Sequence, residues 1–596
     1  SMTVTSTYET RIQSGKKIAI ITLQNPPVNQ LSCGVREGIQ SGIDNIQKDP
    51  NVLGVIIQGS NNTFCAGADI SEFSSGMSGP SLPELIYQLE SLSIPVVASI
   101  EKFALGGGME FALGAHFRVC EANAKLGLPE VNLGLLPGAG GTQRLPRICG
   151  LQFALQMIVG GIPVSSTAAL KSGLVDKVYP SGAPLLPNAI EFLLTKIGTD
   201  VSGLRVRDRK VPGPTGTEAF DAARAMAKKI RRGEKAPESI IKTLEAAVKL
   251  PFDEGMIEEG NLFMELAVNP QARALQHMFF AERQANKITN VSKSAKAKDI
   301  KSLGVVGAGL MGGGIAMCAA NVGIQVVLLD INDEAVKKGI QTIQKNYERS
   351  LKRGKLTQEK LDERMSRIHP TTNYEDFSDC DMVIEAVFEN MDIKKKIFRQ
   401  LDQVCKPGAF LCTNTSFLSI DEIASATNRP EFVIGTHFFS PANVMKLLEN
   451  VRGAKTNDET ILSAMAFGKK IKKVATLVGN CHGFVGNRMI AFYSEQATAL
   501  MLEGALPQQI DRVAVEFGMP MGPLQMADLV GLDLSWRERK RAGTDDVKTN
   551  VADALCEEGR LGQKTGKGFY LYDENRRPVP DDHVTEIILG VSKNLG

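Results

Sequence analysis

The sequence predicts an α/β protein of several domains that ends in an all-helical region. Three observations lead to this prediction. The chain has 596 residues, and a prior of one domain per about 150 residues suggests about four domains. In both halves, strand-length apolar runs alternate with helical patterns on short loops, which favours parallel sheets with crossover helices. Beyond residue 479 the pattern is mainly helical.

Composition and charge limit the classes of function. Hydrophobic residues make up 43% and charged residues 22% of the chain, as in ordinary globular proteins. The net charge of +2 argues against a nucleic-acid partner, and no apolar run is long enough to span a bilayer. The ten cysteines are scattered without a C-x-x-C pair, so we expect reduced thiols in an intracellular protein and no metal site.

The first 100 residues alternate between strands and helices. The expected elements are strands at Lys17–Leu23, Val52–Gln58 and Pro95–Ile100 and helices at Val35–Ile46 and Leu82–Leu92. Short loops join them, so this half is expected to be α/β.

Three loop segments in this half have an unusual composition. Phe64–Ile70 reads F-C-A-G-A-D-I, and Phe103–Leu113 reads F-A-L-G-G-G-M-E-F-A-L. The glycine triplet follows a strand and opens a helix, whose first N–H groups can bind an anion. The third segment, Leu126–Leu145, places an acid among mainly apolar residues and glycines.

Two acids in these segments are candidates for chemistry. Glu110 lies among Met109, Phe111 and other apolar residues, where burial would raise its pKa and destabilise it unless it is used or paired. Glu130 has similar neighbours. The alternative is that both are structural acids that cap helices or accept hydrogen bonds from the backbone.

These three segments resemble the crotonase, or enoyl-CoA hydratase, family, whose fold is a ββα spiral. The resemblance implies that the backbone N–H groups of Ala68 and Gly107 hold a thioester carbonyl and that Glu110 and Glu130 are catalytic. One such N–H donor typically stabilises a developing oxyanion by about 3–4 kcal/mol. Two carboxyl groups can hold one water between them. We assign water activation mainly to Glu110 and delivery of the C2 proton to Glu130.

The amino-acid composition of the chain changes from about residue 201. Leu204–Thr217 is rich in Arg, Lys, Pro and Gly and is expected to be a connector. Three helical segments follow, at Glu218–Ile230, Glu238–Leu250 and Glu254–Asn286. They are expected to complete the first fold and to lead, through the polar linker Val291–Lys298, into the next unit.

A glycine-rich turn organises the second half. The segment from Leu303 runs L-G-V-V-G-A-G-L-M-G-G-G and, after a helical pattern and a second strand, ends on Asp330. In a dinucleotide site Gly307 permits the tight turn, Gly309 admits a pyrophosphate and Gly312 allows close helix packing. The carboxylate of Asp330 would accept hydrogen bonds from a ribose, which favours NAD over NADP. The alternative is an ordinary structural turn, but strand, helix, second strand and acid all fall in place.

The rest of this region supports a doubly wound sheet of the Rossmann type. Expected elements are a charged helical excursion at Glu334–Arg367 and buried strands at Asp381–Ala386 and Phe410–Asn414. Thr413–Phe417 (T-N-T-S-F) closes a strand, where residues face the ligand crevice. His437 lies among aromatic residues. A single histidine is more often structural than catalytic, but this one lies in a nucleotide-binding unit with an acid and an amide nearby.

These segments resemble the L-3-hydroxyacyl-CoA dehydrogenase family. The resemblance implies that His437 is the acid/base and that Glu449 orients it. It also implies that Ser416 and Asn487 hydrogen-bond the substrate oxygen. Two further positions match residues near the cofactor ribose and nicotinamide, Glu389 and Lys394. With NAD bound, His437 would take the hydroxyl proton as hydride leaves C3.

The helical segments after Met489 and the K-T-G-K-G-F-Y segment at Lys564–Tyr570 match the C-terminal domain of that second family. Together the two halves resemble the multifunctional enzymes of fatty-acid β-oxidation, most of all the peroxisomal type. That family carries a second copy of the helical domain, which supports the first, and the printed sequence ends at Gly596 before such a copy.

The resemblance implies four parts: a crotonase-like domain at 1–200, a helical linker completing it at 201–298, a Rossmann NAD-binding domain at 299–478, and an all-α domain at 479–596. It implies hydration of trans-2-enoyl-CoA, oxidation of the (3S)-hydroxyacyl-CoA with NAD, 3,2-enoyl-CoA isomerisation, acyl-CoA thioester substrates and a monomer. It also implies a peroxisomal location, although the chain ends S-K-N-L-G without a terminal S-K-L.

Two alternatives remain open. One is an α-subunit of a mitochondrial or bacterial fatty-acid oxidation complex with the same chemistry and a thiolase partner. The other is a binding relative without turnover, against which the presence of every catalytic residue type argues.

Overall fold

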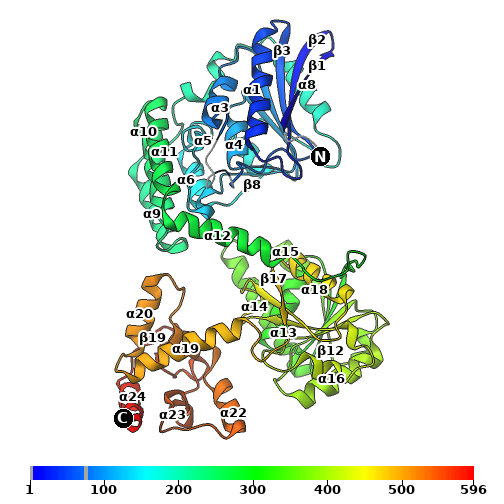
Figure 1. Cartoon of the computed structure of the whole chain (residues 1–596), viewed down its shortest axis with the longest axis vertical. Coiled ribbons are helices and arrows are strands. Elements are labelled where there is room, and N and C mark those ends of the chain that lie inside the picture. The colour runs from blue at the N-terminus through cyan, green and yellow to red at the C-terminus, as the bar shows by residue number, and fades with distance from the viewer. Residues whose placement is uncertain (1–4, 71, 73–77) are drawn as a thin grey trace. The chain divides into compact units, whose positions relative to one another are not determined.

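The structure, a computed structural model, describes residues 5–70, 72 and 78–596. The chain divides into two compact units, residues 1–280 and 281–596, and we describe each by itself. Each unit is built around its own central sheet (Figure 1). The α/β class predicted from the sequence is therefore confirmed.

A six-stranded sheet forms the centre of the first unit. Its strands are ordered β1 (Thr5–Gln13), β2 (Lys16–Gln24), β3 (Val52–Gly59), β4 (Val96–Ile100), β6 (Phe117–Glu121) and β9 (Lys177–Tyr179). All neighbours run parallel except β1 and β2. Strand β1 was not predicted, because its sequence T-S-T-Y-E-T-R-I-Q is polar and only one side of it is paired.

Helices cover both faces of this sheet. Ile21 and Ile57 point to one face, toward α1 (Cys33–Lys48) and α3 (Leu82–Glu90), within one hydrophobic cluster. Their chain neighbours Ile20 and Ile56 point to the other face, toward α8 (Leu186–Lys196). The alternation follows from the two-residue period of a strand, and it explains why these strands are apolar on both sides.

A smaller three-stranded sheet holds the segments singled out in the sequence. It consists of β5 (Phe103–Leu105), β7 (Lys125–Gly127) and β8 (Val164–Ser165). The helices beside it are α4 (Gly107–Leu113), the 3-10 helix η1 (Glu130–Leu133), α5 (Gly141–Cys149), α6 (Leu151–Gly160) and α7 (Ser166–Lys171). The predicted glycine triplet does open a helix, because α4 begins directly after β5.

The helices after residue 201 complete the same core. They are η2 (Ser202–Leu204), η3 (Val206–Asp208), α9 (Thr217–Ile230), α10 (Ala236–Lys249), α11 (Phe252–Ala267) and α12 (Pro270–Ala285). Phe220, Ile240 and Leu266 from three of them join the main cluster of the first unit. The helical segment predicted at Glu254–Asn286 is two helices. The first ends before Asn269, whose side chain accepts a hydrogen bond from Gln271 N, and the second begins at Pro270.

An eight-stranded sheet forms the centre of the second unit. Its order is β12 (Ile368–Thr371), β11 (Gln325–Leu329), β10 (Ser302–Val306), β13 (Met382–Glu385), β14 (Phe410–Thr413), β15 (Val433–Phe438), β16 (Leu447–Arg452) and β17 (Val474–Gly479). The strands from β12 to β15 are parallel, and β16 runs antiparallel to β15. The order reverses between β10 and β13, and ligands bind beyond the strand ends at such a point.

Helices again lie on both faces of this sheet. They are α13 (Leu310–Ala320), α14 (Asp333–Lys352), α15 (Gln358–Ser366), η4 (Tyr374–Phe377), α16 (Met391–Val404), α17 (Ile420–Ala424), η5 (Pro430–Phe432) and α18 (Asp458–Lys470). The helical excursion predicted at Glu334–Arg367 is two helices, because Gly354 turns the chain with a φ of 67°.

The last region is helical, with one two-stranded sheet. Its elements are α19 (Gly486–Leu502), α20 (Pro507–Phe517), α21 (Pro523–Val530), α22 (Asp533–Ala542), α23 (Val551–Glu557), η6 (Gln563–Thr565), β18 (Leu571–Tyr572), β19 (Pro578–Val579) and α24 (Asp582–Leu595). Buried Asp528 accepts hydrogen bonds from Phe569 N, Tyr570 N and the Tyr572 hydroxyl. These hydrogen bonds hold the K-T-G-K-G-F-Y segment against α21.

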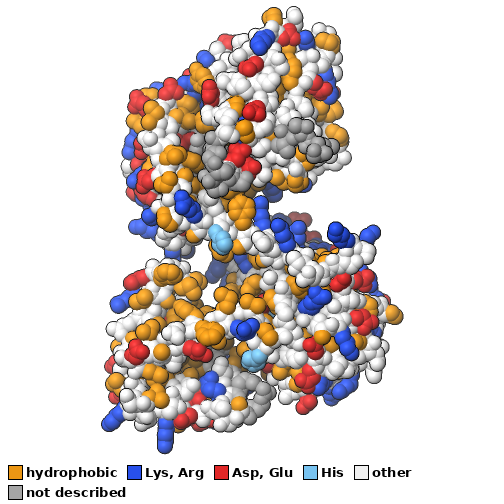
Figure 2. Space-filling model, in the orientation of Figure 1, with side chains coloured by type: hydrophobic (Ala, Val, Ile, Leu, Met, Phe, Trp, Pro, Cys, Tyr) orange, Lys and Arg blue, Asp and Glu red, His pale blue; other side chains and the backbone are white. Residues whose placement is uncertain are grey.

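Surface features bear on partners. Apolar side chains gather over α19 and α20 (Figure 2), among them Met489, Phe492 and Phe517, which are 70%, 70% and 88% exposed. Such patches commonly mark contact surfaces.

No helix in the described part of the chain is both long and apolar enough to cross a membrane. All ten cysteines are free thiols.

Candidate active sites

The backbone N–H groups of Ala68 and Gly107 lie side by side in the first unit. A methyl group on Gly107 would stand 3.3 Å from the Ala68 nitrogen. Each N–H group follows a glycine with a positive φ, which other residues rarely adopt. Gly67 precedes Ala68 and has a φ of 117°, and Gly106 precedes Gly107 and has a φ of 53°. The predicted pair of donors is therefore adjacent in space.

Glu110 lies on α4 and is 3% exposed. Its Oε1 accepts hydrogen bonds from the N–H groups of Ala139 and Gly141, both at 2.8 Å. Burial raises the pKa of Glu110 to about 7, against the lowering effect of the two N–H groups. A carboxyl with this pKa can take or give a proton at neutral pH.

Glu130 is the first residue of the 3-10 helix η1. A methyl group on Gly106 would lie 3.3 Å from Glu130 Oε1, so this carboxyl stands next to the paired N–H groups. Part of the residue is exposed, but its Oε2 is buried and has no hydrogen-bond partner among the described residues. Burial, and then the charge of Glu110, raise the pKa of Glu130 well above its usual range.

A third acid, Glu259 of α11, belongs to the same cluster and was not singled out in the sequence. It is fully buried, and it accepts hydrogen bonds from Gly140 N at 2.7 Å, Thr142 N at 3.1 Å and the Thr142 hydroxyl. Burial, and then the charge of Glu110, raise the pKa of Glu259 to about 8. Its neighbours in the sequence are mostly polar and partly exposed, so no local pattern marked it.

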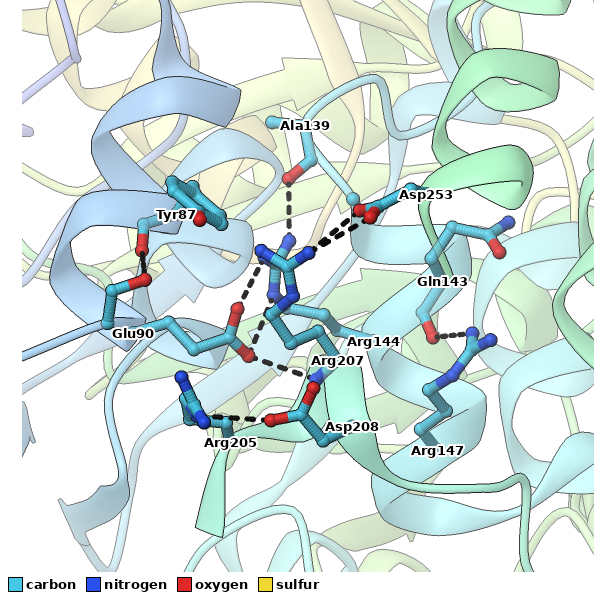
Figure 3. A network of polar contacts seen from close by, with 12 residues as sticks. Tyr87, Glu90, Ala139, Gln143, Arg144, Arg147, Arg205, Arg207, Asp208 and Asp253 are labelled. Carbon is cyan, nitrogen blue, oxygen red and sulfur yellow. Dashed lines mark hydrogen bonds and ion pairs between the residues drawn. The ribbon is translucent and has the colours of Figure 1, made fainter. Parts of the chain in front are cut away.

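A buried ion pair contacts the segment 139–141, whose N–H groups hold Glu110 (Figure 3). Arg144 and Glu90 are 2% and 1% exposed and lie 2.8 Å apart. The guanidinium of Arg144 also donates to the carbonyl of Ala139 at 3.5 Å, and Arg207 N donates to Glu90 at 3.1 Å. Because Ala139 carries one of the N–H groups that hold Glu110, this network fixes the position of that acid.

The glycine turn of the second unit has the features of a dinucleotide site. Gly307 has a φ of 103°, and a methyl group on Gly312 would lie 1.7 Å from the Gly307 carbonyl. A methyl group on Gly309 would meet nothing within 4 Å, so the backbone there is open on the side where a pyrophosphate would approach. Asp330 accepts a hydrogen bond from Ala308 N at 2.8 Å and retains lone pairs for a ribose. These residues fit NAD.

Glu389 and Lys394 lie close together beside this turn. Lys394 is 1% exposed, and its ammonium lies 2.6 Å from Glu385 and 3.5 Å from Glu389. Glu389 in turn accepts hydrogen bonds from the Thr415 hydroxyl and from Ser416 N. The fully buried Glu385 was not predicted, because in the sequence it is simply the end of an apolar strand. It anchors Lys394, which then holds Glu389.

His437 and Glu449 face each other across the antiparallel pair β15 and β16, where they are direct register partners. His437 Nδ1 lies 2.7 Å from Glu449 Oε2, and both side chains are buried. Glu449 Oε1 accepts hydrogen bonds from Val485 N and Gly486 N. Burial acts to raise the pKa of Glu449, but the hydrogen bonds from His437 and Gly486 outweigh it, so this pKa lies below its usual value. An ionised Glu449 can only accept, so Nδ1 carries the proton and Nε2 is free.

Ser416 and Asn487 complete this second set. Asn487 Nδ2 donates to the Ser416 carbonyl at 3.3 Å. Asn487 follows Gly486, which is bound to Glu449, so the start of α19 connects both pairs. The structure therefore brings Ser416, His437, Glu449 and Asn487 into one neighbourhood. Among the described residues no group of three or more His, Cys, Asp or Glu side chains could hold a metal ion.

The two units define the class of an enzyme with two domains of different activity: a crotonase-type unit, in which two acids lie near adjacent backbone N–H groups, and a hydroxyacyl-CoA dehydrogenase-type unit with a nucleotide site. Family models agree with this. The enoyl-CoA hydratase/isomerase family matches residues 13–246. The NAD-binding domain of 3-hydroxyacyl-CoA dehydrogenase matches residues 302–481, and its C-terminal domain matches residues 483–572.

Whole-chain relatives identify the family. A peroxisomal bifunctional enzyme from Danio rerio is 44% identical over 589 residues, 95% of this chain and 81% of the relative. The peroxisomal bifunctional enzyme of Homo sapiens is 41% identical over 594 residues, 96% and 82% of the two chains. The crystal structure of the dehydrogenase part of multifunctional enzyme 1 from C. elegans has a TM-score of 0.42 and 32% identity, and covers 52% of this chain and 73% of that one.

The chain belongs to the family of the peroxisomal bifunctional enzymes. It is accordingly an enzyme of β-oxidation, with an enoyl-CoA hydratase/isomerase domain followed by an NAD-dependent 3-hydroxyacyl-CoA dehydrogenase. The predicted family, fold class, activity and cofactor are confirmed. The roles of individual residues remain predictions, which we develop next.

Proposed function

We propose that this chain hydrates trans-2-enoyl-CoA at Glu110 and Glu130 and oxidises the (3S)-hydroxyacyl-CoA product at His437. The observation that carries the first half is the placement of the two buried acids around the adjacent N–H groups of Ala68 and Gly107. The second half rests on the His437–Glu449 pair at 2.7 Å in the nucleotide-binding unit.

Hydration follows from the unequal protonation of the two acids. The N–H groups of Ala68 and Gly107 hydrogen-bond the thioester oxygen and stabilise the enolate that develops there. Glu110, with a pKa of about 7, takes a proton from water as the water oxygen attacks C3. Glu130, whose pKa is raised by burial and by the charge of Glu110, delivers a proton to C2. The two acids share protons, so the division of labour belongs to the pair.

Isomerisation of a 3-enoyl-CoA needs only part of this site. Glu130 stands next to the paired N–H groups, so its ionised form can remove a proton from C2 while they hold the enolate oxygen. The same carboxyl then returns the proton to C4. We therefore propose 3,2-enoyl-CoA isomerisation as a second reaction of the first centre.

Oxidation depends on the free Nε2 of His437. Glu449 fixes the proton on Nδ1, so Nε2 accepts the proton of the substrate hydroxyl. Ser416 and Asn487, which share a hydrogen bond, would hydrogen-bond the substrate oxygen. NAD supplies the acceptor for the C3 hydride. Gly307, Gly309 and Gly312 would hold its pyrophosphate and Asp330 its ribose, while Glu389, positioned by Lys394, would lie on the nicotinamide side.

Two variants test this division between centres. Glu130→Gln should abolish hydration but keep oxidation of supplied (3S)-hydroxyacyl-CoA, and His437→Gln should do the reverse. Neither variant alone should form NADH from crotonyl-CoA and NAD, and an equal mixture should form it. Loss of both activities in one variant, or no NADH from the mixture, would contradict separate sites.

We also propose a peroxisomal location and a monomeric state with acyl-CoA thioesters as small-molecule partners. The location is supported by the names of the relatives. Co-sedimentation of the native protein with a peroxisomal marker tests it. Light scattering after size exclusion tests the monomer, and a stable complex with a thiolase in the same experiment would favour the α-subunit alternative.

A further inference from the structure

Four consecutive backbone N–H groups at the start of α5 are divided alternately between two carboxylates. Ala139 N and Gly141 N donate to Glu110. Gly140 N and Thr142 N donate to Glu259, to which the Thr142 hydroxyl also donates. A displacement of either acid therefore moves the peptide groups that hold the other.

Helix α11 is built to bring Glu259 to this turn. Gly255, Glu259 and Phe263 are spaced by four residues and lie on one face of the helix. A methyl group on Gly255 would stand 2.1 Å from the side-chain oxygen of Gln143, so any larger residue there would displace the Gln143 side chain between α11 and α5. One turn on either side of Glu259, the helix is thus in close contact with the segment that carries the turn.

Phe263 makes the matching contact at the other end. A methyl group on Gly138 would lie 2.6 Å from its ring. Residues 138–143 therefore contact three successive turns of α11, at Gly255, Glu259 and Phe263. The middle contact is made by the Glu259 carboxylate. A buried carboxylate destabilises a fold more than an apolar residue of similar size unless its hydrogen bonds are satisfied. Its presence here calls for a role that an apolar residue would not perform.

We propose that Glu259 is a positioning residue for hydration, which holds the 139–142 turn so that Ala139 N and Gly141 N keep Glu110 aimed at the water. Glu259 touches neither substrate nor water. It acts through the turn that it holds. The inference rests on the proposed role of Glu110.

The charges around Glu259 decide how its loss would appear in a pH profile. The titratable groups facing the turn are Glu110 on α4, Glu130 on η1 and Arg144 on α5. The charge of Glu259 contributes to the raised pKa of Glu130, and Glu110 and Glu259 repel each other. Glu259 has a pKa of about 8 and Glu110 one of about 7, so Glu259 is mostly uncharged where Glu110 ionises. The N–H groups of Ala139 and Gly141 lower the pKa of Glu110, so a shift of the turn away from Glu110 should raise this pKa. The acid limb of the hydration profile should therefore move to higher pH.

Glu259→Gln is the direct test. The amide keeps one oxygen but replaces the other by an NH2 donor, which would face either Gly140 N or Thr142 N, so the turn must shift. We expect hydration kcat to fall by roughly 10- to 100-fold, the usual effect of a small misplacement. KM for crotonyl-CoA should change little, because Ala68 and Gly107 are untouched. Glu258→Gln makes the same change at the neighbouring position of α11 and should leave hydration at the wild-type level. Wild-type kcat and pH profile in Glu259→Gln would overturn the inference.

Thr142 provides a second test if Glu259→Gln disturbs folding, which would show as lost binding of crotonyl-CoA. Thr142→Val removes one donor to Glu259 and should lower hydration kcat, while Thr142→Ser keeps the hydroxyl and should retain more activity than the valine variant. Equal activity of the valine, serine and wild-type proteins would overturn the proposal. Oxidation of supplied (3S)-hydroxyacyl-CoA in the same samples reports the second unit and should be unchanged.

Glu110→Gln separates this inference from the assignment on which it rests. If Glu110→Gln keeps hydration, the proposed role of Glu110 fails, whatever Glu259→Gln does. If Glu110→Gln abolishes hydration and Glu259→Gln does not slow it, only the positioning role fails.

Discussion

Replacing Glu449 by glutamine should disable oxidation by changing which nitrogen of His437 carries the proton. Glu449 Oε1 accepts from Val485 N at 3.1 Å and Gly486 N at 2.9 Å, and Oε2 accepts from His437 at 2.7 Å. A glutamine amide has only one oxygen. Turning its NH2 toward the two backbone donors creates two donor–donor clashes, so the oxygen stays there and the NH2 faces His437. The histidine must then accept at Nδ1, which places its proton on Nε2.

The expected loss follows from that tautomer. With a proton on Nε2, His437 cannot accept the hydroxyl proton of the substrate. The equivalent change in a Ser-His-Asp triad lowers kcat by about 10⁴-fold, so we expect a loss of about 10³- to 10⁴-fold, or about 4–5 kcal/mol of barrier. KM for the hydroxyacyl-CoA should change little, since Ser416 and Asn487 remain. Raising the pH should not restore the rate, because the amide does not titrate.

NADH formation from supplied (3S)-hydroxyacyl-CoA measures this loss. Hydration of crotonyl-CoA in the same sample serves as the folding control, because it takes place in the other unit. Glu459→Gln is a matched control, since Glu459 is 37% exposed on α18 and pairs only with the surface Lys298. Oxidation by Glu449→Gln within about tenfold of the wild-type rate would refute the tautomer argument.

Four further predictions concern protons, packing and the cofactor. Hydration kcat/KM should fall about tenfold per pH unit below the pKa of Glu110, which burial raises to about 7, and a flat profile from pH 7 to 5 would contradict this. Gly141→Ala should slow hydration but not oxidation, since its methyl group would lie 2.8 Å from the Glu110 oxygen. A hydration rate equal to that of the wild type would show that the turn moves to admit the methyl group at no loss of activity. Burial raises the folded pKa of Asp528 to about 6, so its contribution to stability is present below its unfolded pKa and is lost as pH rises through about 6. The melting temperature read from Trp536, the only tryptophan, should therefore rise from pH 7 to 5, and Asp528→Asn should remove that rise. Asp330→Ser should weaken NAD binding and narrow its advantage over NADP, and unchanged dissociation constants in fluorescence titrations would argue against ribose contact.

The sequence predicted those parts of the sites whose signal is local. The turn from Gly307 to Asp330 could be located because each residue type has a geometric reason within one βαβ unit. Glu110 and Glu130 stood out as acids in apolar surroundings. The pairing of His437 with Glu449 was expected from resemblance, and the structure explains it by the register of two antiparallel strands.

Residues that act across long separations carried no such signal. Glu259 lies on a helix with exposed acidic neighbours, and its meaning depends on contact with a turn more than one hundred positions earlier. Glu385 ends an apolar strand and could not be told from an ordinary strand terminus until Lys394 was placed beside it. The break at Asn269 had a local cause, the following proline, but the strong helical pattern on both sides obscured it.

The two centres share one structural feature, which serves a different role in each. In each, a buried glutamate accepts two backbone N–H groups near the start of a helix: Glu110 at α5 and Glu449 at α19. Two such donors favour the ionised form, yet the pKa of Glu110 rises and that of Glu449 falls. The difference lies in whether a side-chain donor offsets burial. For Glu449, the hydrogen bond from His437 joins the backbone donors and outweighs burial, which favours the anion that orients the histidine. For Glu110, burial outweighs its two backbone donors and raises its pKa to about 7, so it can exchange a proton near neutral pH. A buried acid held by two backbone N–H groups is thus kept ionised or left able to exchange a proton according to the side chain that faces it.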